Sequence, residues 1–136
     1  MGLVHTEITL KNAEDITRAK DGNITVQEVR QMTDTVLVDT GAWTLIINEA
    51  ARKKLGLDYS GKTPGTLDDG KESKYDMAGP IEILWKDRRF VCDAVVLPEA
   101  KDILLGAIPL EALDLIVNPN KQEVVGAHGD QMMHKI

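Results

Sequence analysis

The stretch that decides the fold is "TVLVDTGAWTLII", Thr35–Ile47. Two continuous apolar runs, Val36–Val38 and Leu45–Ile47, flank Asp39-Thr40-Gly41. Asp and Gly are common turn formers, but a turn between exposed strands normally has alternating polarity around it. The flanking runs therefore predict that the carboxylate of Asp39 lies in or near the interior. A buried charge costs several kcal/mol unless it is paired or hydrogen-bonded, and groups kept despite that cost are often functional.

Upstream of this stretch, the sequence predicts strands. Val4–Leu10 alternates between apolar and polar residues, as a half-buried strand does. Lys20–Asn23 has the composition of a turn, and Ile24–Val29 resumes a strand-like pattern, which predicts a hairpin around that turn. Thr35–Val38 is then predicted to be a short buried strand, with Asp39 directly after its last residue.

Directly downstream, the sequence predicts a helix of about two turns. Asn48 is a good N-cap, Ala50–Lys54 are helix formers, and Gly56 can take the left-handed conformation that ends a helix. The basic residues of the last turn also suit the helix dipole.

The remainder is predicted to be strands separated by turns. Asp68–Lys71 has the composition of a hairpin tip, and Ile81–Trp85, the turn Lys86–Arg89 and Phe90–Leu97 suggest a second hairpin.

In the last third of the chain, the sequence predicts a short helix that begins near Pro109, a strand Leu115–Val117 and a last strand Glu123–Val125. From Ala127 the tail has no regular pattern. The whole chain is predicted to be one all-β domain over residues 1–136, closed or sandwich-like, with a core at about 3–126 and a tail at 127–136.

Composition excludes several classes of function. The chain has 136 residues and a formal net charge of −6, so a phosphate-binding surface for nucleic acid is not expected. No apolar run reaches the ~18 residues that cross a membrane, and no signal peptide is evident, so a cytoplasmic protein without a membrane partner is expected. Cys92 is the single cysteine and is predicted to be a small buried residue. The scattered His5, His128 and His134 are expected to face solvent and bind no metal.

Three ordered segments carry a resemblance to a known family. They are "LVDTGA" at Leu37–Ala42, "KLGL" at Lys54–Leu57 and "ILLGAIPLEALDLIV" at Ile103–Val117. Together they resemble the retroviral-type (retropepsin-like) aspartic proteases, above all their small bacterial and archaeal relatives. The resemblance runs from about Leu3 to Gly126. It implies a closed, β-barrel-like acid protease fold with a flap hairpin and one or two short helices.

The resemblance also implies roles for the Asp-Thr-Gly loop. Asp39 would be the catalytic aspartate of an aspartic endopeptidase. Thr40 would hydrogen-bond across a dimer axis, Gly41 would allow close approach of the backbone, and Ala42 would border the substrate cleft.

Two further segments receive roles from the same resemblance. Leu104, Leu105 and Gly106 would form a strand passing behind the active-site loop, with the glycine making room for the crossing. The hairpin Leu67–Lys74 would be the flap over a bound peptide. The residues assigned to its tip are Leu67, Asp68, Asp69 and Gly70.

Two features depart from the family. Trp43 follows Ala42 where a smaller or polar residue is more usual, so the cleft is expected to be narrower there. The flap tip carries Asp68 and Asp69 instead of glycines, which would disfavour acidic substrates if they approach the cleft.

The chemistry adds one requirement of its own. Hydrolysis by carboxylates needs one group acting as base and one acting as acid, and two carboxyls that share a proton meet that need. The chain has one Asp-Thr-Gly, so two copies must meet with Asp39 facing Asp39, which predicts a homodimer acting on a peptide or protein substrate without a cofactor.

Two other functions remain open. The same fold could serve as a non-catalytic peptide-binding or dimerisation module. A monomeric precursor or regulatory form could also pair only under some conditions.

Overall fold

The computed structural model describes residues 3–67 and 69–136, and within these residues most of the chain is β-structure. The strands are β1 (Val4–Asn12), β2 (Gln31–Val38), β3 (Leu45–Ile47), β4 (Tyr59–Thr66), β5 (Glu72–Trp85), β6 (Arg88–Val96), β7 (Leu104–Leu105), β8 (Leu115–Asn118) and β9 (Glu123–Gly126). The helices are α1 (Ala13–Lys20), α2 (Glu49–Leu55) and α3 (Ala107–Ala112), with a 3-10 turn η1 (Val26–Glu28).

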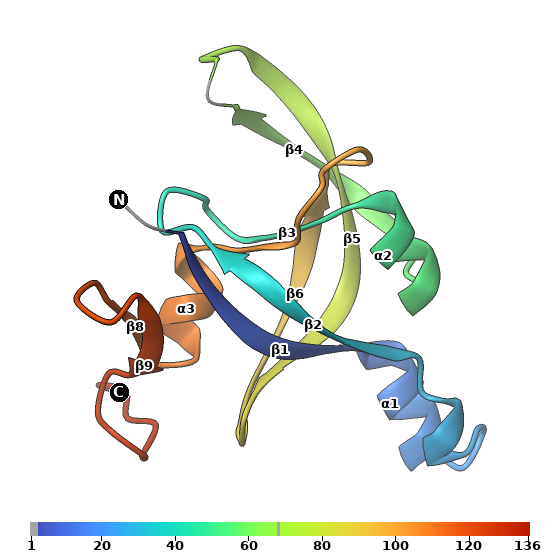
Figure 1. The fold of residues 1–136 in the computed structure, drawn as a ribbon. Coiled ribbons are helices and arrows are strands. Elements are labelled where there is room, and N and C mark those ends of the chain that lie inside the picture. Colours follow the sequence, from blue (N-terminus) through green and yellow to red (C-terminus); the bar gives the residue numbers. More distant parts are fainter. Residues whose placement is uncertain (1–2, 68) are drawn as a thin grey trace.

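Seven strands form one sheet that closes on itself. Their order is β1-β2-β7-β3-β6-β5-β4, and β1 pairs a second time with β5, for example Leu10 opposite Ile83. This second pairing joins the first strand of the order to a strand near its other end and makes the sheet a ring (Figure 1). The predicted closed all-β architecture is therefore confirmed. One detail differs, because the turn after β5 is only Lys86-Asp87 and β6 already begins at Arg88.

The ring encloses an aliphatic core. In β1 the inward positions Ile8 and Leu10 are fully buried while Thr9 between them is partly exposed, as the alternation predicted. Other core side chains come from every part of the ring and from the helices, and they include Leu45, Ile47, Leu55, Ile81, Ile83, Leu105 and Leu113.

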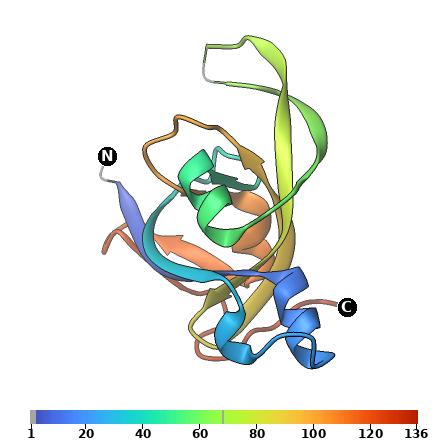
Figure 2. The same cartoon turned by 90° about the vertical axis from the view of Figure 1, so that its right-hand side faces the viewer.

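Helix α2 covers one end of the ring and matches its prediction (Figure 2). The Asn48 side chain accepts a hydrogen bond from the Ala51 N–H at 2.9 Å, and Gly56 ends the helix with φ 62°. Ala51 and Leu55 face the core. Capping and burial thus determine both the limits and the orientation of this helix.

The predicted hairpin around Lys20–Asn23 is wrong. Helix α1 occupies the segment before that turn, and Val26–Glu28 forms a single 3-10 turn instead of a strand. The cause lies at Asn12, whose side chain accepts a hydrogen bond from the Asp15 N–H at 3.0 Å and so starts a helix where β1 ends. The antiparallel partner of β1 is β2, which begins at Gln31.

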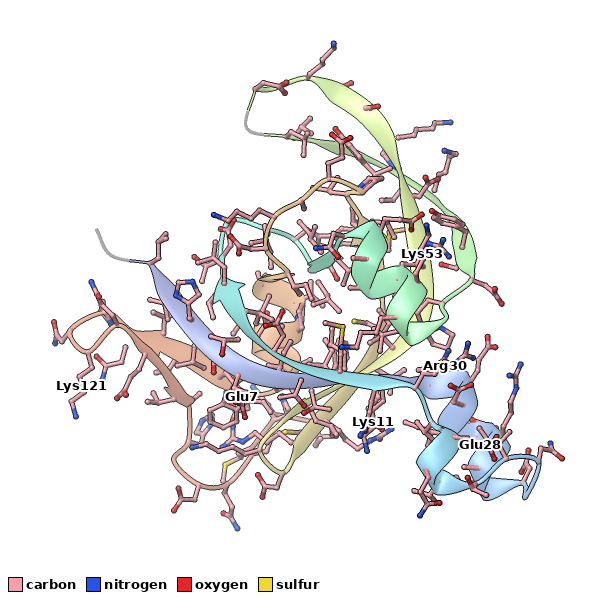
Figure 3. The ribbon with its side chains drawn as sticks, turned by 45° about the vertical axis from the view of Figure 1, so that its right-hand side comes forward. Glu7, Lys11, Glu28, Arg30, Lys53 and Lys121 are labelled. Atoms are coloured by element: carbon pink, nitrogen blue, oxygen red, sulfur yellow. The ribbon has the colours of Figure 1, made fainter. Side chains whose placement is uncertain are left out.

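An ion pair joins helix α1 to Arg30, the residue directly before β2. The Arg30 guanidinium binds the buried Asp15 carboxylate through two nitrogens, at 2.8 and 2.9 Å, and the Arg30 backbone N–H donates to it at 3.1 Å. Hydrogen bonding from Arg30 holds the pKa of Asp15 below its ordinary value. Figure 3 shows Arg30 beside α1, on the same side of the molecule as Glu28.

From Ala107 onward the chain forms one short helix and a second, smaller sheet beside the ring. Helix α3 begins at Ala107, slightly before the predicted start near Pro109, and β8 and β9 make a two-stranded sheet of their own, as the two predicted strands suggested. The tail beyond β9 has no regular structure but is attached, because His128 and the Met133 N–H both bind the carboxylate of Asp114. Among the described helices, none has both the length and the apolar character needed to span a bilayer.

Candidate active site

The Asp39 loop starts from the middle of the closed sheet. Strand β2 runs parallel to β7, with Leu37 opposite Leu104 and Val38 opposite Leu105. The Asp39 N–H continues this ladder by donating to the Leu105 carbonyl at 3.1 Å. The backbone at the start of the loop is therefore fixed by the sheet, and this places the carboxylate at the end of β2, where Val36 is buried and Leu37 and Val38 are half-buried.

The Asp39 carboxylate is held by its own loop. Its Oδ1 accepts a hydrogen bond from the Gly41 N–H at 2.9 Å, and the Ala42 N–H donates to the Asp39 carbonyl at 3.1 Å. Among the described residues, Oδ2 has no hydrogen-bond partner. The side chain is half-buried in the single chain, less than the flanking apolar runs predicted, because it lies at the wall of a cleft instead of within the core.

The rest of the loop is fastened to helix α3. The Ala107 N–H donates to the Ala42 carbonyl at 2.8 Å, and the Ile108 N–H donates to the Trp43 carbonyl at 3.0 Å. Thr40 lies beyond these contacts and is exposed. The backbone of the loop is therefore hydrogen-bonded to β7 at one end and to α3 at the other, while the Thr40 side chain is exposed to solvent.

Strand β7 passes directly against this loop. A Cβ added at Gly106 would lie 2.3 Å from the Thr44 carbonyl oxygen and 2.7 Å from the Ala42 carbonyl oxygen. Both distances are far below contact distance, so a residue with a side chain cannot occupy this position without moving the loop. Leu105 is fully buried behind the loop, while Leu104 lines the cleft.

A cleft of about 540 Å³ opens in front of Asp39. Its floor comes from the loop and the neighbouring strand ends, and its opposite wall is β4. The lining residues beyond the loop are Ile46, Thr63, Pro64, Gly65, Thr66, Leu67, Tyr75, Val95, Leu97 and Leu104. Most of them are apolar, and Asp39 is the only lining residue in the described chain with a charged side chain.

The opposite wall belongs to a long hairpin formed by β4 and β5, which projects beyond the ring (Figure 1). A Lys62–Asp76 pair at 2.9 Å connects its two strands, and the Gly70 N–H donates to the Leu67 carbonyl at its tip. Leu67 reaches the cleft, whereas Asp69 and Gly70 are exposed and are not part of its lining. Asp68 lies outside the described residues.

Trp43 lines the cleft with 57% of its surface exposed, and a narrowing of the entrance by this side chain stays a prediction. Sequence reasoning missed most of the other lining residues. Thr63, Pro64 and Tyr75 belong to the body of the hairpin, and Val95 lies opposite Ile46 in the ring. The sequence showed only that these segments have the character of strands. It could not show that they line one cleft, because that depends on the order of the strands in the sheet.

The histidines and the cysteine take no part in this cleft. His128 Nδ1 lies 2.8 Å from the Asp114 carboxylate, and His134 Nε2 lies 3.2 Å from the Glu111 carbonyl. No group of three potential metal ligands occurs among the described residues. Burial raises the pKa of the Cys92 thiol to about 12, which leaves it un-ionised and unreactive at neutral pH.

Several solved structures are similar to this chain. The EIAV protease complexed with the inhibitor HBY-793 is similar to this chain, with a TM-score of 0.47 and 26% sequence identity. The similarity covers 60% of this chain and 77% of that chain. No protein-family model matches the sequence, and no curated protein matches it.

Proposed function

We propose that this protein is an aspartic endopeptidase that acts as a homodimer, with one Asp39 from each copy in the reaction. The observation that carries the proposal is the cleft itself. A carboxylate fixed at the end of strand β2 and the wall of a projecting hairpin line the same largely apolar space of about 540 Å³. That is the arrangement needed to hold an extended peptide against an acid–base group and keep bulk water away.

The chemistry requires two carboxyls. One carboxylate takes a proton from water as the water attacks the peptide carbonyl, and the other carboxyl gives a proton to the carbonyl oxygen. Two carboxyls a few ångström apart share one proton, because like charges at that distance cannot both ionise. They titrate as a unit, so the proton belongs to the pair and to neither Asp39 alone.

The single chain offers half of this arrangement. Asp39 is the only charged side chain lining the cleft in the described chain, so the second carboxyl has to come from another copy. A two-fold axis beside the exposed Thr40 would bring the two loops together. In this arrangement Thr40 supports the loop across the axis, and Gly41 holds the carboxylate through its N–H.

The substrate is expected to be an extended peptide with apolar side chains at the reacting bond. The floor carries Ile46 and Leu104, and the hairpin carries Pro64 and Leu67, so apolar side chains would bury surface on both sides. The hairpin, with its tip at Leu67–Lys74, would act as the flap.

The proposal is tested by incubating the protein with a denatured protein mixture from mildly acidic to neutral pH, with and without a transition-state-mimicking inhibitor of aspartic proteases. Cleavage that the inhibitor blocks is expected. Asp39→Asn is the matched control, because the amide oxygen can still accept the Gly41 N–H while the acid–base chemistry is lost. Cleavage by Asp39→Asn at the wild-type rate would refute the role of this residue.

A second candidate is supported by one observation. The hydrogen bond from the Gly41 N–H to Asp39 Oδ1 is the kind of contact that shapes a turn, so the aspartate could serve structure in a peptide-binding module. In that case Asp39→Asn would keep peptide binding and the wild-type protein would cleave nothing. The two functions therefore predict opposite results for cleavage by the wild-type protein.

A further inference from the structure

Arg88 is a buried cation at the start of β6, with 4% of its surface exposed. Its hydrogen-bond acceptors in the described chain are backbone carbonyls: Leu113 at 3.0 Å and Asp114 at 2.7 Å through Nη1, and Gly129 at 2.7 Å through Nη2. A buried charge is costly unless hydrogen bonds satisfy it. A guanidinium spent on three carbonyls therefore indicates that the position of those carbonyls matters.

Two of these carbonyls lie at the C-terminal end of α3. Leu113 is the C-cap of this helix, and Asp114 follows it in the left-handed conformation, with φ 54°. The last carbonyls of a helix lack partners within the helix and carry the negative end of its dipole, so a cation binds there favourably. Arg88 therefore holds the end of α3 together with the left-handed residue that follows it.

The other end of α3 holds the Asp39 loop. The Ala107 N–H donates to the Ala42 carbonyl at 2.8 Å, and the next N–H of the helix donates to the Trp43 carbonyl at 3.0 Å. With six residues, α3 is about 9 Å long and too short to be a stable helix by itself. The helix is thus one short link between the Arg88 guanidinium and the backbone that follows Asp39.

The closed sheet fixes Arg88 itself. Its backbone pairs with Trp85 in the ladder between β5 and β6, and its guanidinium lies over the Trp85 ring, 5.5 Å from the centroid. The Trp85 Nε1–H donates to Thr6 Oγ1 at 2.9 Å, which ties this pair to β1. A Cβ added at Gly126 in β9 would lie 2.5 Å from Arg88 Nη2. The guanidinium is therefore packed tightly, with little room to shift.

We propose that Arg88 is a positioning residue for the Asp39 carboxylate and acts on it through α3. The sheet sets the place of Arg88, Arg88 sets the end of α3, and the first turn of α3 sets the carbonyls of the loop. The ladder between β2 and β7 supports the loop at its start, at the Asp39 N–H. This inference rests on the proposed function, because a loop displaced by about 1 Å matters most where two carboxyls must meet.

The test uses three variants of the full chain. Arg88→Met removes the cation and keeps an unbranched side chain. Arg88→Lys keeps the charge on a single nitrogen, which cannot reproduce the fork between the end of α3 and Gly129. The matched control is Arg89→Met, at the next residue of β6, where the guanidinium binds Glu82 at 2.9 Å. This control removes the same charge and leaves a buried carboxylate unpaired, so it destabilises the ring at a contact that does not involve α3.

Amide hydrogen exchange, followed residue by residue by NMR, reports the loop contacts without any need for activity. In Arg88→Met, protection at the Ala107 and Ile108 N–H groups should fall by about tenfold or more relative to the Arg52 N–H in α2, because α3 opens more easily once its end is released. Arg88→Lys should give an intermediate ratio. Arg89→Met should keep the wild-type ratio, because general destabilisation lowers the protection of all three amides alike.

Kinetics on a peptide substrate separate positioning from binding. The turnover number kcat is measured at protein concentrations where it no longer rises, and at a temperature where all variants are folded. Arg88→Met should lower kcat by about tenfold or more and change KM by less than about twofold, because the walls of the cleft stay in place while the carboxylate moves. Arg88→Lys should recover part of kcat, and Arg89→Met should keep the wild-type value.

An exchange ratio or a kcat in Arg88→Met that equals the value of Arg89→Met would overturn the inference. If Arg88→Met fails to fold, Arg88→Lys decides by the same comparison. The two assays also separate this inference from the proposed function. A wild-type protein that cleaves no peptide removes the protease, and the exchange ratio then still decides whether Arg88 fixes the Asp39 loop.

Discussion

Replacing Gly106 with alanine is expected to destabilise the protein and misplace the Asp39 loop. The added methyl group would lie 2.3 Å from the Thr44 carbonyl oxygen, and the Thr44 N–H and the Ala42 carbonyl are also within 2.8 Å. All three are backbone atoms, so no flexible side chain can move away. Gly106 has φ −91°, which any residue adopts, so the cost comes from the contact alone.

The size of the effect follows from that contact. Overpacking a well-packed site costs about 1–3 kcal/mol, and rigid backbone on several sides favours a value of about 3 kcal/mol. For a chain of this length, that lowers the melting temperature by about 10 °C. Calorimetry measures the shift. Gly65→Ala is the control for stability, because its Cβ would lie at an ordinary 3.5 Å from the Tyr75 ring.

Activity should fall further than stability. At a temperature where Gly106→Ala is still folded, the displaced loop should reduce cleavage of a denatured protein by about a hundredfold, because a shift of about 1 Å is enough to spoil catalytic geometry. A variant that melts within about 2 °C of wild type would refute the argument from packing.

Three more predictions concern other contacts. Arg30→Ala should lower the free energy of unfolding by about 2 kcal/mol, since it leaves the buried Asp15 carboxylate unpaired. Because the pKa of Asp15 is lowered in the folded state, the ion pair stabilises the fold above the ordinary carboxyl pKa of 3.8. This stabilisation is lost as the pH falls through the lower folded-state pKa. Chemical denaturation should therefore show that the difference in unfolding free energy between variant and wild type shrinks in acid. Trp43→Ala should widen the cleft entrance and raise kcat/KM for peptides with bulky side chains by about tenfold, measured with a peptide library. Gly41→Ala would place a Cβ 3.2 Å from Asp39 Oδ1, so cleavage should fall by about tenfold or more with little change in melting temperature.

Local signals in the sequence predicted much of the fold. The limits of α2 follow from the Asn48 cap and the Gly56 stop, both of which act within a few residues. The same kind of signal was present at Asn12, where it starts α1, but the strand-like pattern of Ile24–Val29 favoured a hairpin instead. Such patterns do not show which strands pair, so the contact of β1 with both β2 and β5 required the structure.

The candidate site was likewise predictable from the sequence only in part. Asp39 stands out in the sequence because an apolar run is interrupted there by residues that packing would not choose, whereas the crossing at Gly106 was implied only by the resemblance to a known family. Thr63 and Tyr75 carry no such signal, and they reach the cleft because a hairpin brings them opposite the loop.

Strand β5 has 14 residues and runs from Glu72 in the hairpin to Trp85 in the ring, with an irregularity in its register against β6 between Ala78 and Ile81. Near its start it pairs with β4 alone, and further along it is held on both sides by β6 and β1. Any swing of the hairpin must therefore fade along one continuous backbone. Amide hydrogen exchange should record this as a gradient of protection, fast near Glu72 and slowest near Ile83, which would locate the point where movement stops.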